Sequence, residues 1–113
     1  MDQEPHLGNL RNTFQRACEL IAHGNYEAAL RELLWINDNP IPDFLPSEMF
    51  RRACGFQAWE QLAYLYPPAK KKMEEVLAKN IEAAKNGTAG TSIQADIRRM
   101  QGILASELLT SSE

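Results

Sequence analysis

Apolar residues recur along most of the chain at spacings of three and four, which places them on one face of an α-helix. No segment shows the strict alternation of apolar and polar residues that is typical of a β-strand. The first helical segment covers residues 9–23. Its apolar positions are Leu10, Phe14, Ala17, Cys18 and Ile21. The pattern therefore predicts an all-α protein.

A second helix is predicted over residues 26–38, directly after the first. Gly24 suits the left-handed position that ends a helix, and Asn25 suits the N-cap of the next one. Apolar residues cover more than one face of this second helix: Tyr26, Ala29, Leu30, Leu33, Leu34, Trp35 and Ile36. We therefore expect it to have neighbours on more than one side.

Three prolines within residues 39–46 interrupt the helical pattern, because proline lacks an amide donor and restricts the residue before it. This loop is expected to pack on the core through its apolar residues, Ile41, Phe44 and Leu45. Ser47 is the predicted N-cap of a third helix, in which Gly55 is expected to mark a close approach of two helices. The third helix has two apolar stripes, one of Met49, Ala53, Phe56 and Ala63 and one of Phe50, Cys54, Ala58, Leu62 and Leu65.

Two further helices complete the predicted fold of about five. The fourth begins within Tyr66-Pro67-Pro68-Ala69, since proline is tolerated in a first helical turn, and it ends at Asn86-Gly87. The fifth begins at Thr91, which is placed to form a capping box with Gln94.

The chain has 113 residues, a length that suits one globular domain spanning residues 1–113. Residues 1–8 and 110–113 are expected to be mobile ends of that domain. Its residues are 44% hydrophobic and 24% charged. This composition is typical of a soluble protein and excludes a disordered tail, a collagen-like repeat and a cysteine scaffold.

The sequence predicts a cytoplasmic protein. The N-terminal residues lack the basic start and apolar run of a signal peptide. No apolar stretch approaches the roughly 20 residues that a membrane-spanning helix needs. Cys18 and Cys54 are far apart within apolar helical patterns, and we expect two buried free thiols, as is usual in a reducing compartment.

The first two predicted helices contain features of a tetratricopeptide unit. Gly24 closes one helix, Tyr26 opens the next, and Ala29 lies where that family packs a small residue against the first helix. Residues 10–40 therefore resemble a tetratricopeptide-like hairpin, which implies an antiparallel pair of helices. No second copy follows at a period of 34 residues, so a solenoid of several repeats is not predicted.

A second resemblance covers residues 59–69. The pattern W-x-x-L-x-x-x-Y-P-P-A, preceded by Arg51, is similar to a motif in short uncharacterised bacterial helical proteins. Ala53 stands where those proteins usually have a serine. The resemblance implies a bacterial source and a protein-binding role, and it implies no catalytic activity.

The sequence contains no recognisable catalytic, cofactor-binding or metal-binding constellation. His6 and His23 do not match the spacings of known zinc motifs, and His23 is expected to interact with the C-terminal end of the first helix. Two carboxylates are predicted to form ordinary i,i+4 ion pairs, Glu27 with Arg31 and Glu75 with Lys79. We therefore predict a protein that is not an enzyme and has no cofactor.

Charge is distributed unevenly along the chain. Residues 1–50 carry eight acidic and three basic residues, a net charge of −5, whereas residues 51–113 carry seven acidic and nine basic residues, a net charge of +2. The clustered basic residues suit a solvated face, an acidic protein partner or a nucleic acid. The overall net charge of −3 disfavours nucleic acid. The clusters are Arg51-Arg52, Lys70-Lys71-Lys72 and Arg98-Arg99.

The acidic half predicts a surface that binds another protein, because such a surface attracts a basic partner and can cover its cleft. Aromatic residues dominate binding hot spots, and Trp35, Trp59, Tyr64 and Tyr66 are the candidates, although the helical pattern favours burial for both tryptophans. The predicted partner-binding residues are Glu27, Glu32, Trp35, Asp38, Asp43, Phe44 and Glu48.

The predicted function is a protein-binding inhibitor, for example a bacterial immunity protein that masks a basic toxin or enzyme domain. One alternative is a tetratricopeptide-like adaptor that binds a peptide, and a second is a nucleic-acid-binding regulator that uses the basic doublets. A membrane partner is not predicted, and the sequence assigns no oligomeric state.

Overall fold

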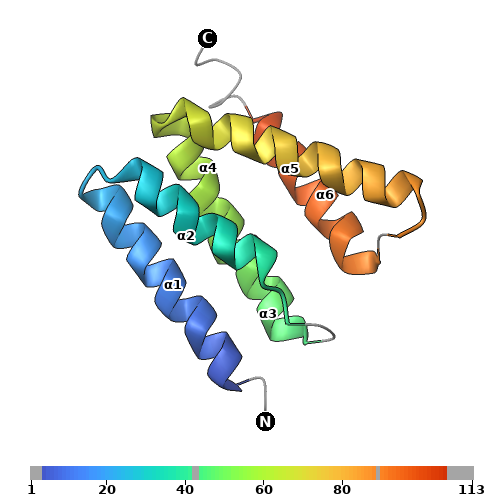
Figure 1. The fold of residues 1–113 in the computed structure, drawn as a ribbon, viewed down its shortest axis with the longest axis horizontal. Coiled ribbons are helices and arrows are strands. Elements are labelled where there is room, and N and C mark those ends of the chain that lie inside the picture. The colour runs from blue at the N-terminus through green and yellow to red at the C-terminus, as the bar shows by residue number, and fades with distance from the viewer. Residues whose placement is uncertain (1–3, 42–43, 89, 107–113) are drawn as a thin grey trace. The chain divides into compact units, whose positions relative to one another are not determined.

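The computed structural model describes residues 4–41, 44–88 and 90–106, and helices account for most of these ranges (Figure 1). The elements are α1 (Glu4–Ala22), α2 (Tyr26–Asp38), α3 (Leu45–Phe50), the π-helical segment η1 (Arg51–Gly55), α4 (Phe56–Leu65), α5 (Pro67–Lys85) and α6 (Thr91–Leu104). Because α3, η1 and α4 follow one another without a break, they form one of five successive helical segments. The prediction of an all-α protein with about five helices is confirmed.

The chain divides into two compact units, Met1–Leu62 and Ala63–Glu113, and the boundary falls within α4. We refer to them as unit 1 and unit 2. Unit 1 contains α1, α2, α3, η1 and most of α4, whereas α5 and α6 belong to unit 2.

In unit 1, α1 and α2 pack together as an antiparallel hairpin (Figure 1). Gly24 has a φ of +80°, the left-handed conformation that was predicted for it. The Gly24 amide donates to the Ile21 carbonyl at 3.1 Å, and the Asn25 amide donates to the Leu20 carbonyl at 2.8 Å. These two bonds satisfy carbonyl groups at the end of α1. Asn25 takes the predicted N-cap position of α2, but its side chain makes no capping hydrogen bond.

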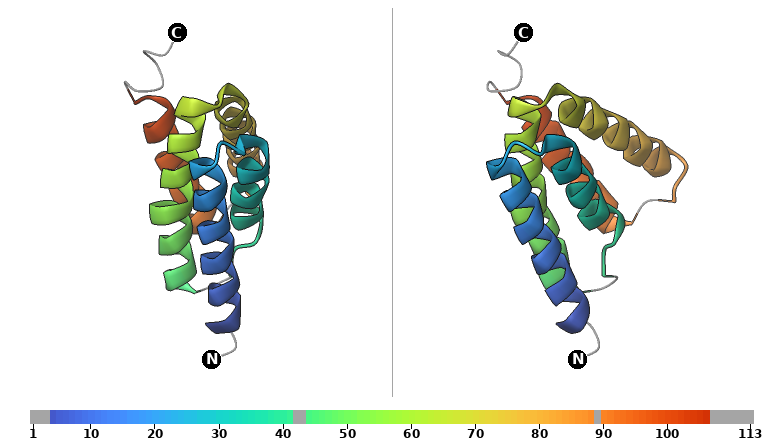
Figure 2. Two further views of the ribbon diagram at one scale, coloured as in Figure 1. Left: turned by 90° about the vertical axis from the view of Figure 1, so that its left-hand side faces the viewer. Right: turned by 60° about the vertical axis from the view of Figure 1, so that its left-hand side comes forward.

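α2 lies against both α1 and η1, as its several apolar faces predicted. The segment formed by α3, η1 and α4 runs in the same direction as α1 (Figures 1 and 2). A Cβ added at Gly55 would lie 3.2 Å from Cγ2 of Ile36, so this glycine allows η1 to approach α2 closely. The prediction made for Gly55 is therefore confirmed.

The core of unit 1 is apolar and includes a pair of aromatic rings. Phe56 and Trp59 meet edge to face with their centroids 6.1 Å apart, and both side chains are buried. Large side chains that are almost completely buried with them are Leu10, Leu33, Ile36 and Leu62.

Six residues that were expected to be buried are exposed instead, including Leu45 of the proline-rich loop. The expectation of two buried thiols was also wrong, because Cys54 is only partly buried. The six exposed residues are Cys18, Trp35, Leu45, Met49, Ala53 and Leu65. The exposure of Met49 has a local cause. Ser47 and Arg51 are buried and bond to Ile41 and Ile36, so Met49 lies on the opposite, solvent-facing side of the helix.

The predicted ends of three helices need correction. α1 begins at Glu4, so the part of residues 1–8 that the structure describes is helical, whereas residues 110–113 lie outside the described ranges. α3 begins at Leu45 with Phe44 as its N-cap, and Ser47 is inside the helix. Gly90 is the N-cap of α6 and Thr91 is its first residue, so the predicted capping box of Thr91 and Gln94 does not form.

In unit 2, α5 and α6 pack against each other as a second hairpin. α5 begins at Pro67, within the predicted boundary Tyr66-Pro67-Pro68-Ala69, and it ends at the predicted Asn86-Gly87, where Gly87 has a φ of +74°. The buried side chains include Ala69, Met73, Met100 and Ile103. Within the described ranges, no helix is both long enough and apolar enough to cross a membrane.

Candidate protein-binding site

An open groove of about 240 Å³ lies in unit 1, beside the N-terminal half of α1 and the C-terminal end of α2. Residues of α1 at spacings of three and four form one side, and residues of α2 and the loop after it form the other. The groove is lined by His6, Asn9, Leu10, Trp35, Asn39, Pro40 and Ile41. We call it the Trp35 groove.

Trp35 is the exposed aromatic residue of this groove. It is 41% exposed, whereas Trp59 is fully buried, so the two tryptophans have different roles. The side chain of Asn39 donates to the Trp35 carbonyl at 2.8 Å and satisfies that group near the end of α2. The expectation of burial was wrong for Trp35 and correct for Trp59.

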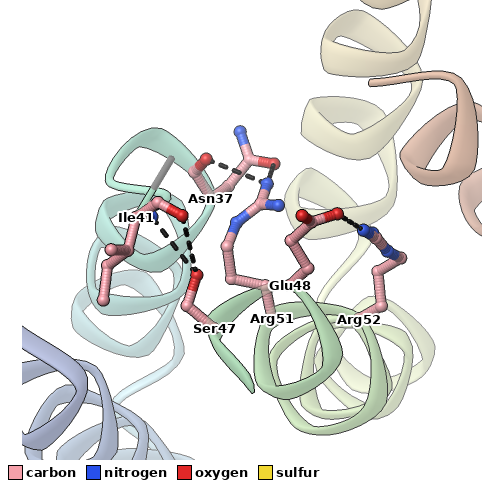
Figure 3. A network of polar contacts seen from close by, with 6 residues as sticks. All are labelled: Asn37, Ile41, Ser47, Glu48, Arg51 and Arg52. Carbon is pink, nitrogen blue, oxygen red and sulfur yellow. Dashed lines mark hydrogen bonds and ion pairs between the residues drawn. The ribbon is translucent and has the colours of Figure 1, made fainter. Parts of the chain in front are cut away.

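Ser47 fixes the loop that forms one edge of the groove. The Ile41 amide donates to Oγ of Ser47 at 3.2 Å, and the Ser47 hydroxyl lies 3.4 Å from the Ile41 carbonyl, to which it donates (Figure 3). Ser47 has no exposed surface, so both interactions are shielded from water. The sequence pattern assigned a capping role to this residue, which was wrong, and missed its bonds to Ile41.

Arg51 holds the end of α2 that carries Trp35. Its Nε donates to the Ile36 carbonyl at 3.3 Å. Its Nη2 donates to the Asn37 carbonyl at 3.1 Å and to the Asn37 side-chain oxygen at 3.3 Å (Figure 3). The guanidinium also lies over the Phe56 ring, 5.6 Å from its centroid. A positive group is favourable here, because the carbonyl end of a helix carries partial negative charge.

This role of Arg51 was missed because the residue was grouped with Arg52 as a basic doublet. Arg51 is only 2% exposed and Arg52 pairs with Glu48, so the first doublet is largely engaged within unit 1. One sequence signal was present, since Ser47, Arg51 and Gly55 follow one another at intervals of four, the spacing of one helix face. In the structure all three are buried.

Three of the predicted partner-binding acids form ion pairs within unit 1. Glu32 of α2 pairs with Arg16 of α1, with 2.9 Å between the carboxylate oxygen and Nε. Glu27 pairs with Arg31 at 3.8 Å, as predicted, but both side chains are highly exposed and the pair contributes little to stability. Glu48 pairs with Arg52 one turn along the same helix.

Glu32 and Asp38 flank Trp35 along α2. They lie three residues before it and three residues after it, so all three are neighbours on the helix surface. Asp38 is exposed and accepts a hydrogen bond from the Asn37 amide group at 3.1 Å, which leaves its charge available. The structure therefore brings together Glu32, Trp35 and Asp38.

The other predicted site residues are not part of this cluster. Glu27 lies two turns before Trp35 on α2, and Glu48 lies on α3. Phe44 is partly buried at the start of α3, and Asp43 lies outside the described residues. The sequence reasoning did not identify His6, Asn9 or Asn39 as groove residues, because their proximity depends on how α1 packs against α2.

Two titratable side chains outside the groove, His23 and Lys72, have structural partners. Nδ1 of His23 lies 2.7 Å from the Glu19 carbonyl, which can only accept, so the ring donates to the end of α1 as predicted. Lys72 pairs with Glu75 at 3.5 Å, and Lys71 is exposed. Within residues 4–41, 44–88 and 90–106, no three His, Cys, Asp or Glu side chains are gathered where they could hold a metal ion.

Comparison with known proteins adds no relative to this description. No protein-family model matches the chain, and neither a curated protein nor a solved structure is significantly similar to it. The tetratricopeptide resemblance of residues 10–40 and the bacterial motif of residues 59–69 therefore remain hypotheses.

Proposed function

We propose that this protein is a non-enzymatic binding module that holds a basic protein partner at the Trp35 groove. The observation that carries this proposal is the exposed ring of Trp35 in a groove, with the available carboxylate of Asp38 beside it on α2. Glu32, on the other side of Trp35, is paired with Arg16. Aromatic residues beside a pocket are the usual energetic centres of protein interfaces, and charged neighbours select the partner.

The size of the groove favours a protein ligand over a small molecule. Sites for small molecules and cofactors usually enclose about 300–1,000 Å³ and surround most of the ligand. The Trp35 groove is open and holds about 240 Å³, which suits one or two side chains of a partner. Its lining contains apolar groups together with the side-chain amides of Asn9 and Asn39, so it can bind a side chain with an apolar stem and a polar tip.

The charge of unit 1 indicates that the partner is basic. Residues 1–62 contain nine acidic and five basic residues, a net charge of −4. Arg51 is buried and does not present its positive charge to a partner. An acidic surface of this kind accelerates association with a positively charged protein and disfavours an acidic one.

The biological role that we propose is inhibition in the cytoplasm, where the module covers the active surface of a basic toxin or enzyme domain, as an immunity protein does. The dimensions of the groove also suit a peptide adaptor. The two roles differ in one measurable result: an inhibitor abolishes the activity of its bound partner at a ratio of one to one, whereas an adaptor leaves that activity intact.

The proposed site can be tested before any natural partner is known. Peptides are selected from a random display library on the immobilised full-length protein, and Kd is then measured for each purified peptide. We expect the selected peptides to combine an apolar residue with Lys or Arg. We expect the substitution Trp35→Ala to raise their Kd by about tenfold or more, because it removes the central contact.

Met49→Ala is the matched control, since Met49 is 61% exposed but does not line the groove. This substitution should change Kd by less than about twofold. The proposal is wrong if both substitutions weaken binding equally, if Trp35→Ala has no effect, or if the wild-type protein selects no peptide.

A further inference from the structure

Cys18 and Cys54 lie on neighbouring helices of unit 1, each about one turn after a packed aromatic ring. Phe14 of α1 and Phe50 of α3 meet edge to face with their centroids 5.5 Å apart. Each cysteine follows its phenylalanine by four residues. Because α1 runs parallel to the segment formed by α3, η1 and α4, a step of one turn along each helix leads to facing positions (Figure 2).

The pKa of the Cys18 thiol agrees with the placement that the Phe14–Phe50 contact indicates. Partial burial raises this pKa above its ordinary value, and Cys54 and then Glu19 raise it further.

We propose that Cys18 and Cys54 form a redox-responsive pair that closes into an intramolecular disulfide between α1 and η1. Both are free thiols in this structure, and Cys18 is exposed, so a soluble oxidant can reach it. A disulfide requires Cα atoms within about 7 Å, a separation available to facing residues on closely packed helices. In reducing compartments such bonds are usually transient and report oxidation.

A disulfide oxidant such as oxidised glutathione supplies the chemistry. The Cys18 thiolate attacks one sulfur atom, forms a mixed disulfide and releases one glutathione thiolate. The Cys54 thiolate then attacks the Cys18 sulfur and releases the second glutathione. Two protein thiols thereby lose two protons and two electrons, and the oxidant is reduced to two thiols. The raised pKa of Cys18 lowers its thiolate fraction at neutral pH, so closure is faster under alkaline conditions.

The test uses the full chain, reduced and then incubated with oxidised glutathione at an alkaline pH. The remaining thiols are alkylated, and the intact mass and a non-reducing peptide map are recorded. We expect a monomer that has lost both free thiols and about 2 Da in mass, with Cys18 linked to Cys54. Dithiothreitol should restore both thiols.

The double substitution Cys54→Ser with Ala53→Cys is the matched control. It keeps two cysteines but moves the second to an exposed neighbouring position, which points in a different direction around the helix. We expect this variant to accumulate mixed disulfides with glutathione. The proposal is overturned if the wild-type protein accumulates stable mixed disulfides or linked dimers, or if the control closes as readily as the wild type.

Discussion

Arg51 connects three parts of unit 1 through a single side chain. Its guanidinium donates to two carbonyl groups at the end of α2 and lies over Phe56. Because backbone carbonyls cannot be removed by mutation, loss of the guanidinium leaves them without these donors in a region shielded from water. An apolar replacement of similar length therefore cannot restore the hydrogen bonds that the carbonyl groups lose. A buried ion pair differs, because both of its partners can be replaced by apolar residues.

Arg51→Met should lower the free energy of unfolding by about 2 kcal/mol, because hydrogen bonds from a charged donor are lost. Urea denaturation measures the change. Arg11→Met is the control, since Arg11 is exposed on α1 and its replacement should alter stability by less than about 0.5 kcal/mol. Equal losses in the two variants would show that Arg51 does not anchor α2.

At the scale of single residues, sequence patterns predicted the backbone conformation of a residue better than the partners of its side chain. The left-handed conformation of Gly24 and the proline in the first turn of α5 follow from local backbone preferences, and they were predicted correctly. Ser47 and Arg51 were misinterpreted, because their partners lie 6 and about 15 residues away. A short polar residue before an apolar stretch resembles a helix cap until the packing of the preceding loop is known.

At the scale of elements, the approach of η1 to α2 depends on the absence of a side chain at Gly55. Valine at this position would place three carbon atoms where one added carbon is already 3.2 Å from Ile36. Gly55→Val should therefore lower the free energy of unfolding by about 1–3 kcal/mol through overpacking. Chemical denaturation, with the helical content checked by circular dichroism, measures this change.

Gly8→Ala provides the comparison within the same unit. Gly8 lies in α1, and an added Cβ would meet no atom within 4 Å. Alanine should therefore raise stability by about 0.5–1 kcal/mol, because glycine is the weaker helix former. A stabilising effect at both positions would contradict the close approach that we assign to Gly55.

The helices themselves were predictable because each has a stripe of apolar residues at helical spacing. The π-helical turn was not, since it lies where η1 contacts α2, and that contact depends on how residues far apart in the sequence pack together. The same limit applies to the Trp35 groove. Trp35 was identified as a candidate residue, but His6 and Asn9 join it only through the packing of α1 on α2.

At the scale of the molecule, the uneven charge along the sequence is the feature most relevant to binding. Asp38→Lys reverses a charge beside Trp35, and Glu74→Lys makes the same change in net charge on α5. We expect the first substitution to weaken binding of a selected basic peptide by about tenfold at low salt and the second by less than about twofold. The difference should shrink in about 0.5 M salt, where surface charges are screened. Equal effects would indicate that only net charge matters.

The central claim is that a partner contacts Trp35. The chain has two tryptophans, one exposed in the groove and one fully buried, so their indole N–H signals in an NMR spectrum report on two distinct places. We predict that titration with a selected peptide shifts the Trp35 signal to saturation and leaves the Trp59 signal nearly unchanged. The Kd obtained from the Trp35 shift should equal the Kd measured separately for the same purified peptide. A saturable binding curve that leaves the Trp35 signal in place would contradict the proposed site.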